Sequence, residues 1–230
     1  MSDAPVAPRR LPHGYTNATS IDADASPQGR RVIKRYLGPD AAERLSCEVR
    51  ALHALAGRFP VPRLLDHDTS RIVVGYLVGV PGQELLEQEP LPVLHAVGRA
   101  ARRLQDMDFS ESVDLPGAGE VLVHGDFGPQ NMLFGDDGRL TGVVDWEFAH
   151  LGEPIEDLAW AEWIVRTHHP HLTDALPALF GGYGSRPSWS QRHSAMLARC
   201  AEMLDFARRW SQEAADLWHQ RVLTTEALRE

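Results

Sequence analysis

The stretch over residues 121–145 constrains the fold of this 230-residue chain more than any other part of its sequence. The apolar residues 121–123 predict a short buried strand, which leads into the polar loop HGDFGPQN at 124–131. The apolar runs at 132–134 and 140–144 flank an Asp-Asp-Gly turn and predict a β-hairpin. A strand followed by a loop and a hairpin in this order brings the end of the hairpin close to the loop.

Three side chains that carry oxygen atoms fall within this unit. Asp126 and Asn131 lie five residues apart in the loop, and Asp145 ends the hairpin. Hard oxygen ligands of this kind suit Mg²⁺, which proteins commonly hold with one or two carboxylates together with substrate phosphates. Asp and Asn also shape turns, but the position of Asp145 at the end of the hairpin favours a metal and phosphate site over a purely structural role.

The N-terminal region contains Lys34, the only lysine among the 23 basic residues of the chain. The runs 15–22 and 30–37 predict two strands joined by a turn at 24–29, with Lys34 in the middle of the second strand. A lysine on a strand is usually exposed at the surface. In an arginine-rich chain it can also indicate a site where a guanidinium fork cannot replace a compact ammonium group.

A helix predicted between Pro39 and Gly57 decides between these two interpretations. One face of this helix carries a stripe at helical spacing, formed by Ala41, Leu45, Glu48, Leu52 and Leu55. A carboxylate on a buried stripe costs several kcal/mol unless it is paired. Glu48 is therefore predicted to face a cation, and this favours a buried role for Lys34.

The rest of the pattern predicts two parts joined by a hinge. Residues 62–65 and 71–77 predict two more strands, and the Gly-rich segment 75–82 predicts a hinge that contains the domain boundary. Residues 91–107 predict a long helix. The Pro-rich residues 1–13 predict a loose arm.

The motifs HGDFGPQN and VVDWE, with Lys34 and Glu48 upstream, resemble those of the aminoglycoside phosphotransferase family, the small-molecule branch of the protein-kinase-like fold. The resemblance implies an α+β, bilobal fold, with a small antiparallel-sheet lobe over residues 1–78 and a mainly helical lobe over residues 79–230. It also implies an enzyme that transfers the γ-phosphoryl group of ATP to a hydroxyl of a small molecule, with the assistance of Mg²⁺.

The resemblance implies roles for the polar residues of the C-terminal lobe. Asp126 would accept or orient the proton of the acceptor hydroxyl, as the catalytic base. Asn131 and Asp145 would bind the Mg²⁺ that bridges the phosphates. His124 would support the catalytic loop through hydrogen bonds, and Asp157, in the segment EPIEDLAW, would brace the same loop.

The resemblance also implies a nucleotide site between the lobes. Lys34, fixed by Glu48, would hold the α- and β-phosphates. The segment 14–20 lies where the family covers the phosphates, although it is not a GxGxxG loop. The adenine would lie against the hinge. The remaining nucleotide-binding candidates, from the covering loop and the hinge, are Thr16, Asn17, Leu77 and Val78.

Composition excludes several other partners. The formal net charge of −9 argues against nucleic acid, whose binding needs clustered cations. No apolar run approaches the roughly 20 residues that span a bilayer, and no apolar stretch near the N-terminus is typical of a signal peptide. The two cysteines are isolated, which fits a reducing compartment. We therefore expect a cytoplasmic protein without membrane partners, and the oligomeric state stays open.

The acceptor is not specified by composition. Residues 160–230 contain eight acids and eight arginines, whereas residues 1–159 contain 24 acids and 15 basic residues. This balance does not favour a polycationic acceptor such as an aminoglycoside, and a small hydroxylated metabolite or another antibiotic is equally compatible. Five of the six tryptophans lie in residues 160–230, and we expect most of them in the core and one or two in an acceptor pocket.

Two other classes of function stay open at this point. The first is a catalytically silent nucleotide-binding module, a pseudokinase that acts through partners; the presence of every expected polar residue argues against it. The second is a metal-dependent hydrolase that uses His124, Asp126 and Asp145. A hydrolase would give no role to Lys34 and Glu48.

Overall fold

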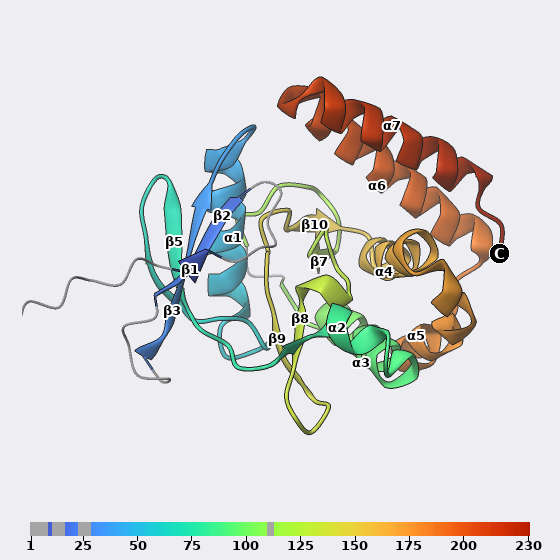
Figure 1. The fold of residues 1–230 in the computed structure, drawn as a ribbon, viewed down its shortest axis with the longest axis horizontal. Coiled ribbons are helices and arrows are strands. Elements are labelled where there is room, and N and C mark those ends of the chain that lie inside the picture. The colour runs from blue at the N-terminus through green and yellow to red at the C-terminus, as the bar shows by residue number, and fades with distance from the viewer. Residues whose placement is uncertain (1–8, 11–16, 23–28, 110–112) are drawn as a thin grey trace, which may run out of the picture.

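The computed structural model describes residues 9–10, 17–22, 29–109 and 113–230. Figure 1 shows an N-terminal part in which a sheet carries one helix, beside a mainly helical C-terminal part. This arrangement confirms the predicted fold class, an antiparallel sheet followed by a helical region. The lobe boundary predicted at residue 78 falls in the segment that joins the two parts, and it stays a prediction.

The N-terminal sheet has the strand order β1-β2-β3-β5-β4, and all its neighbouring strands are antiparallel. A single helix, α1, lies between β3 and β4 in sequence and contacts β3, β4 and β5. The elements of this part are β1 (Arg9–Arg10), β2 (Asn17–Asp22), β3 (Arg31–Tyr36), α1 (Ala41–Leu55), β4 (Leu64–His67) and β5 (Arg71–Gly75).

The C-terminal part combines two small sheets, β6-β8-β9 and β10-β7, with helices that lie mainly on the side away from the N-terminal sheet (Figure 1). Among the described residues, no helix is both long enough and apolar enough to cross a membrane. The elements are β6 (Val80–Pro81), α2 (Gly82–Leu86), α3 (Pro90–Gln105), β7 (Val121–Val123), the 3₁₀ helix η2 (Pro129–Asn131), β8 (Met132–Phe134), β9 (Leu140–Val143), β10 (His150–Gly152), α4 (Ile155–His168), the 3₁₀ helix η3 (Pro170–Ala175), α5 (Leu176–Tyr183), α6 (Trp189–Trp210) and α7 (Gln212–Ala227).

Two expectations need correction. Arg9 and Arg10, expected in a loose arm, form β1 and pair with Ile21 and Ser20 of β2, because this pairing satisfies backbone groups at the edge of the sheet. The second hairpin strand ends at Val143 rather than at residue 144. The predicted turn at 24–29 falls largely outside the described residues, and so does Thr16.

Helix α1 places the charged member of its stripe at the sheet. Leu45, Leu52 and Leu55 are all buried, and Leu55 is completely inaccessible to solvent. Glu48 lies on the same buried face and is only 3% exposed. The sequence periodicity therefore gave the correct buried face of α1, including its one carboxylate.

Helices α3 and α5 approach each other closely because glycines lie at their contact. A Cβ atom at Gly182 of α5 would overlap the carbonyl oxygen of His95 in α3. At the preceding position, Gly181, a Cβ atom would meet nothing within 4 Å. The close approach of the two backbones therefore requires glycine at residue 182 and not at residue 181.

This difference gives a matched pair of stability predictions. Gly182→Ala is expected to lower the free energy of unfolding by about 1–3 kcal/mol, because the helices must move apart. Gly181→Ala is expected to raise the free energy of unfolding by up to about 1 kcal/mol, because alanine favours helix over glycine. Urea unfolding of the two variants measures both effects, and equal effects of the two substitutions would contradict the close packing of α3 on α5.

Candidate active site

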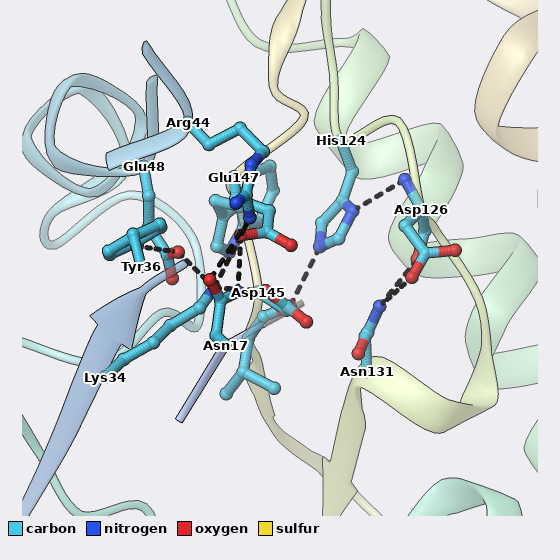
Figure 2. Close-up of polar contacts among 12 residues, drawn as sticks. Asn17, Lys34, Tyr36, Arg44, Glu48, His124, Asp126, Asn131, Asp145 and Glu147 are labelled. Atoms are coloured by element: carbon cyan, nitrogen blue, oxygen red, sulfur yellow. Dashed lines mark hydrogen bonds and ion pairs between the residues drawn. The ribbon is translucent and has the colours of Figure 1, made fainter. Parts of the chain in front are cut away.

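Lys34 lies in the middle of the N-terminal sheet and points toward a group of carboxylates (Figure 2). Its Nζ lies 2.5 Å from Glu48 Oε2, in contact with Asp145 Oδ1 and 3.5 Å from Glu147 Oε2. Burial alone would lower the pKa of Lys34, but these three carboxylates outweigh burial and hold that pKa well above its usual value. The cation predicted to face Glu48 is therefore Lys34, and it is fully charged at neutral pH.

Three carboxylates lie around the one ammonium group of Lys34, so the cluster has more negative than positive charge. Glu48, Asp145 and Glu147 each place one oxygen within 4.8 Å of the others. Glu48 and Glu147 are buried, whereas the Asp145 side chain is 39% exposed. Tyr36 adds a hydroxyl that donates a hydrogen bond to Glu48 Oε2. Asp145 is therefore the member of this group that an incoming cation would reach.

Glu147 connects the C-terminal part to the N-terminal sheet and to α1. Its Oε2 accepts hydrogen bonds from Asn17 Nδ2 at 2.6 Å and from Arg44 Nη1 at 2.7 Å. Arg44 Nη1 also donates to Asn17 Oδ1 at 3.1 Å, and all three residues are less than 10% exposed. The sequence analysis did not single out Glu147 or Arg44. The second acid of VVDWE was the available signal, because it lies two residues after Asp145.

Asn17 has a different environment from the one expected. Its side chain donates a hydrogen bond to Glu147 and accepts one from Arg44, whereas we expected it to contact phosphate. The phosphate contact predicted for Asn17 stays a prediction. The neighbouring candidate, Thr16, lies outside the described residues.

Asp126 lies in the loop after β7, and its carboxylate is held by three donors. Asn131 Nδ2 donates to Oδ2 at 2.9 Å and to the Asp126 carbonyl at 2.8 Å. Trp160 Nε1 donates to Oδ1 at 2.9 Å, and Gln130 Nε2 donates to the same oxygen at 3.3 Å. Burial raises the pKa of Asp126 to about 6, although the hydrogen bonds from Trp160 and Asn131 act in the opposite direction. The carboxylate is therefore mainly ionised at neutral pH.

The loop and the hairpin are held together by the backbone. Val144 N donates to the Asn131 carbonyl at 2.9 Å, so one predicted metal ligand, Asn131, is bonded to the residue that precedes the other, Asp145. The side-chain Nδ2 of Asn131 donates to Asp126. The Oδ1 of Asn131 is therefore the side-chain atom that can bind a cation. Asp145 itself adopts a left-handed conformation with φ of 70°, which is uncommon for a residue other than glycine.

His124 and Asp157 make contacts that support the loop. His124 Nδ1 accepts the Asp126 backbone N–H at 3.1 Å, so its Nε2–H donates to the Val144 carbonyl at 2.9 Å. Burial lowers the pKa of His124 to about 4, which keeps the ring neutral. The Asp157 carboxylate accepts the backbone N–H groups of His124 at 2.8 Å and Gly125 at 3.1 Å. These bonds tie both residues to the backbone of the loop, and the supporting role expected of them stays a prediction.

The two hinge candidates, Leu77 and Val78, lie between β5 and β6. Val78 is 74% exposed, and its carbonyl accepts a hydrogen bond from Thr141 Oγ1 at 3.0 Å. The Leu77 side chain lies against Gly142 of β9, where a Cβ atom would overlap it. An adenine contact at these two residues stays a prediction.

A cavity of about 590 Å³ lies beside the loop, between the start of α4 and α6. Its lining includes Gly125, which precedes Asp126, and Trp160, which bonds the Asp126 carboxylate. Arg199 and Glu202 of α6 form another part of the wall and pair at 2.8 Å. Trp160 is one of the one or two tryptophans expected in such a pocket, whereas nothing in the sequence pointed to Arg199 there.

Glu156 of α4, which lines this cavity, forms a titrating pair with His150 of β10 at 2.8 Å. Burial alone would lower the pKa of His150, but the hydrogen bonds that its ring donates to Glu156 and to the Phe148 carbonyl outweigh burial and raise that pKa. The pair therefore stabilises the fold fully below the unfolded-state pKa of about 6.5 and loses its effect as the pH rises through the folded-state pKa.

Glu156→Gln is accordingly expected to lower the free energy of unfolding by about 0.5–1 kcal/mol at pH 6 and by clearly less at pH 9. Denaturant unfolding at the two pH values measures the difference. Asp106→Asn is the control, because Asp106 pairs with Arg102 at 2.9 Å and arginine does not titrate in this range. A Glu156→Gln effect that stays constant between pH 6 and pH 9 would contradict the assignment of a charged His150.

Comparison with known proteins relates this geometry to a sequence family. Residues 8–120 and 113–193 match the model of a family described as the phosphotransferase enzyme family. Viomycin phosphotransferase of Streptomyces vinaceus is 44% identical over 64 residues, which are 26% of this chain and 21% of that protein. The matched segment thus spans about a fifth of that relative's length.

Solved structures are similar over almost the whole chain. Aminoglycoside phosphotransferase APH(4)-Ia, in a ternary complex with AMP-PNP and hygromycin B, has 17% identity and a TM-score of 0.68, covering 95% of this chain and 92% of that one. Macrolide 2′-phosphotransferase MphH from Brachybacterium faecium has 19% identity and a TM-score of 0.68, covering 96% and 93%. At these identities the similarity establishes a shared fold.

Proposed function

The chain belongs to the phosphotransferase enzyme family, and from this premise we propose that it is an ATP-dependent kinase for a hydroxyl group of a small molecule. The observation that carries the proposal is the arrangement of two groups at one site. Lys34 with its buried carboxylates lies on one side, and Asp126 with Asn131 lies on the other (Figure 2). A charge-neutralising lysine opposite a carboxylate base is what phosphoryl transfer to a hydroxyl requires.

In this proposal Asp126 accepts the proton of the acceptor hydroxyl. As the O–H bond breaks, the acceptor oxygen forms a bond to the γ-phosphorus of ATP. The bond between that phosphorus and the oxygen bridging to the β-phosphate breaks, and ADP leaves with the electron pair. Lys34 contributes a fixed positive charge to the phosphates of the nucleotide, and Glu48 keeps its ammonium group in place.

Mg²⁺ fits the donor set of the site. Asn131 and Asp145 would hold it, and the neighbouring carboxylate of Glu147 adds further negative charge. These are carboxylate and amide oxygens without any sulfur or imidazole among them, the set that hard divalent cations prefer. When bound, Mg²⁺ would neutralise charge on the phosphates of the nucleotide.

The acceptor would occupy the cavity of about 590 Å³ beside the loop. This volume is in the range of small-molecule sites, and its position next to Trp160 brings it close to the Asp126 carboxylate. Its lining includes Glu153, Glu156 and Glu202 together with Arg199. Of these, only Glu202 and Arg199 belong to residues 160–230, so the balance of acids and arginines in that segment does not describe the charge of the cavity wall.

Titration calorimetry of ATP with and without Mg²⁺ tests the nucleotide site. We expect Mg²⁺ to tighten ATP binding by about tenfold or more in the wild type, and we expect Asp145→Ala to lose that gain. Asp137→Ala, a substitution of an exposed residue in the hairpin turn, is the matched control. Absence of binding to ATP and GTP under both conditions would overturn the proposal, whereas binding would justify a screen of aminated and non-aminated small hydroxyl compounds.

The alternatives account for less of the structure. A hydrolase that used His124, Asp126 and Asp145 would give no role to the buried pair of Lys34 and Glu48. It would also need His124 at the substrate, whereas both ring nitrogens are engaged by the backbone. A silent pseudokinase would bind ATP in the calorimetric experiment but would convert no acceptor in the screen.

A further inference from the structure

We propose that Trp160 is a positioning residue for Asp126, whose carboxylate it holds so that Oδ2 faces the acceptor hydroxyl. This inference rests on the proposed function, because it assigns Asp126 as the base. Trp160 lies in α4, 34 residues after Asp126, and its indole N–H reaches Oδ1 at 2.9 Å. Trp160 also lines the cavity proposed for the acceptor, so one side chain contacts both the base and the substrate space.

The two oxygens of Asp126 are used unequally. Oδ1 accepts from Trp160 Nε1 at 2.9 Å and from Gln130 Nε2 at 3.3 Å, which uses both of its lone-pair directions. Among the described residues, Oδ2 accepts one side-chain hydrogen bond, from Asn131 Nδ2 at 2.9 Å. Oδ2 therefore keeps one lone-pair direction open for a further hydrogen bond. We infer that Oδ2 is the atom that takes the proton of the substrate hydroxyl.

Trp160 is itself held firmly, as a positioning group must be. Its ring stacks on Trp163, with centroids 4.2 Å apart and planes at 8°, and Trp218 of α7 lies parallel at 6.2 Å. The Arg199 guanidinium also lies over the Trp160 ring, 6.0 Å from its centroid. Trp160 is only 4% exposed, and its indole N–H has Asp126 Oδ1 as its hydrogen-bond partner.

A residue that served packing alone would not need an indole. Phenylalanine would keep an aromatic ring in the stack and would lose the N–H donor. The Trp163 indole N–H provides the comparison, because it donates to Thr225 Oγ1 at 2.7 Å and makes no contact with Asp126 among the bonds described. Trp160 and Trp163 are both almost fully buried in α4, so their substitutions should cost similar stability.

The kinetic test compares Trp160→Phe with Trp163→Phe, using an acceptor found in the screen. We expect Trp160→Phe to lower kcat by about tenfold, because the base loses its fixed orientation. The KM for ATP should change by less than about twofold, and Trp163→Phe should leave kcat within about twofold. Similar thermal midpoints of the two variants would exclude a difference in folding as the cause. Equal kcat values for the two variants would overturn the proposal.

A spectroscopic test needs no substrate and so separates this inference from the proposed function. The chain has six tryptophans, whose indole N–H groups give six signals in a ¹H–¹⁵N spectrum. The Trp160 signal is assigned by its loss in Trp160→Phe. We expect that signal to shift clearly in Asp126→Asn at constant pH, because the charged acceptor is gone, while the Trp163 signal stays in place. An unshifted Trp160 signal would overturn the contact even if the enzyme is an active kinase.

Discussion

Asp126→Asn should lower kcat for phosphoryl transfer by a factor of about 10²–10⁴, the contribution expected of a positioned general base. The substitution keeps the shape of the side chain but removes the group that takes the hydroxyl proton. The affinity for ATP should stay within about twofold of the wild type, because Lys34 and Asp145 are unchanged. Steady-state kinetics with the acceptor and calorimetry with Mg²⁺ and ATP measure the two quantities separately.

The hairpin turn offers a control for this experiment. Asp136→Asn makes the same chemical change at an exposed residue between β8 and β9, and it should leave kcat unchanged. Turnover of Asp126→Asn within tenfold of the wild type would exclude Asp126 as the base. Loss of ATP binding together with turnover would instead indicate that the substitution had disturbed the loop as a whole.

Lys34→Met should weaken both the fold and the reaction. It leaves Glu48 and Glu147 buried without the ammonium group, and removal of one partner of a buried ion pair typically costs about 3–5 kcal/mol. We also expect kcat/KM for ATP to fall by about 10²-fold or more, because a fixed positive charge at the phosphates is lost. Denaturant unfolding and steady-state kinetics measure the two losses.

Arg35→Met is the matched control for this substitution. Arg35 is the next residue of β3, and since strand side chains alternate, it lies on the opposite face and is exposed. It should change the free energy of unfolding by less than about 0.5 kcal/mol and leave the kinetics unchanged. A Lys34→Met enzyme with wild-type kcat/KM would favour the hydrolase interpretation, in which Lys34 has no chemical role.

The elements that the sequence predicted well are those with a strong local period or a tight turn. The stripe of α1 gave the buried face of that helix, and the loop and hairpin after residue 121 were located to within a residue. The need of Glu48 for a buried cation followed from the same stripe. Each of these inferences depends on neighbours in sequence, where periodicity reports directly which side chains point inward.

The contacts that the sequence did not reveal join residues far apart in the chain. Glu147 bonds Asn17 across 130 residues and Arg44 across 103 residues. The sequence placed Asn17 at the nucleotide phosphates because its position matched a covering loop. Only the folded chain shows that its amide is shared between Arg44 and Glu147, since nothing in the pattern around residue 17 specifies a partner so distant.

The C-terminal helices show the same limit. Nothing in the sequence after residue 157 predicted a contact with the N-terminal part, but α6 extends back to it, where Arg209 pairs with Asp40 at 2.6 Å (Figure 1). Sequence alone pointed to the residues of the candidate site, because Lys34, Asp126 and Asp145 stand out by residue type and local spacing. Only the tertiary structure shows that Trp160 bonds Asp126, because an aromatic residue on a helix looks the same in sequence whether it fills a core or faces a carboxylate.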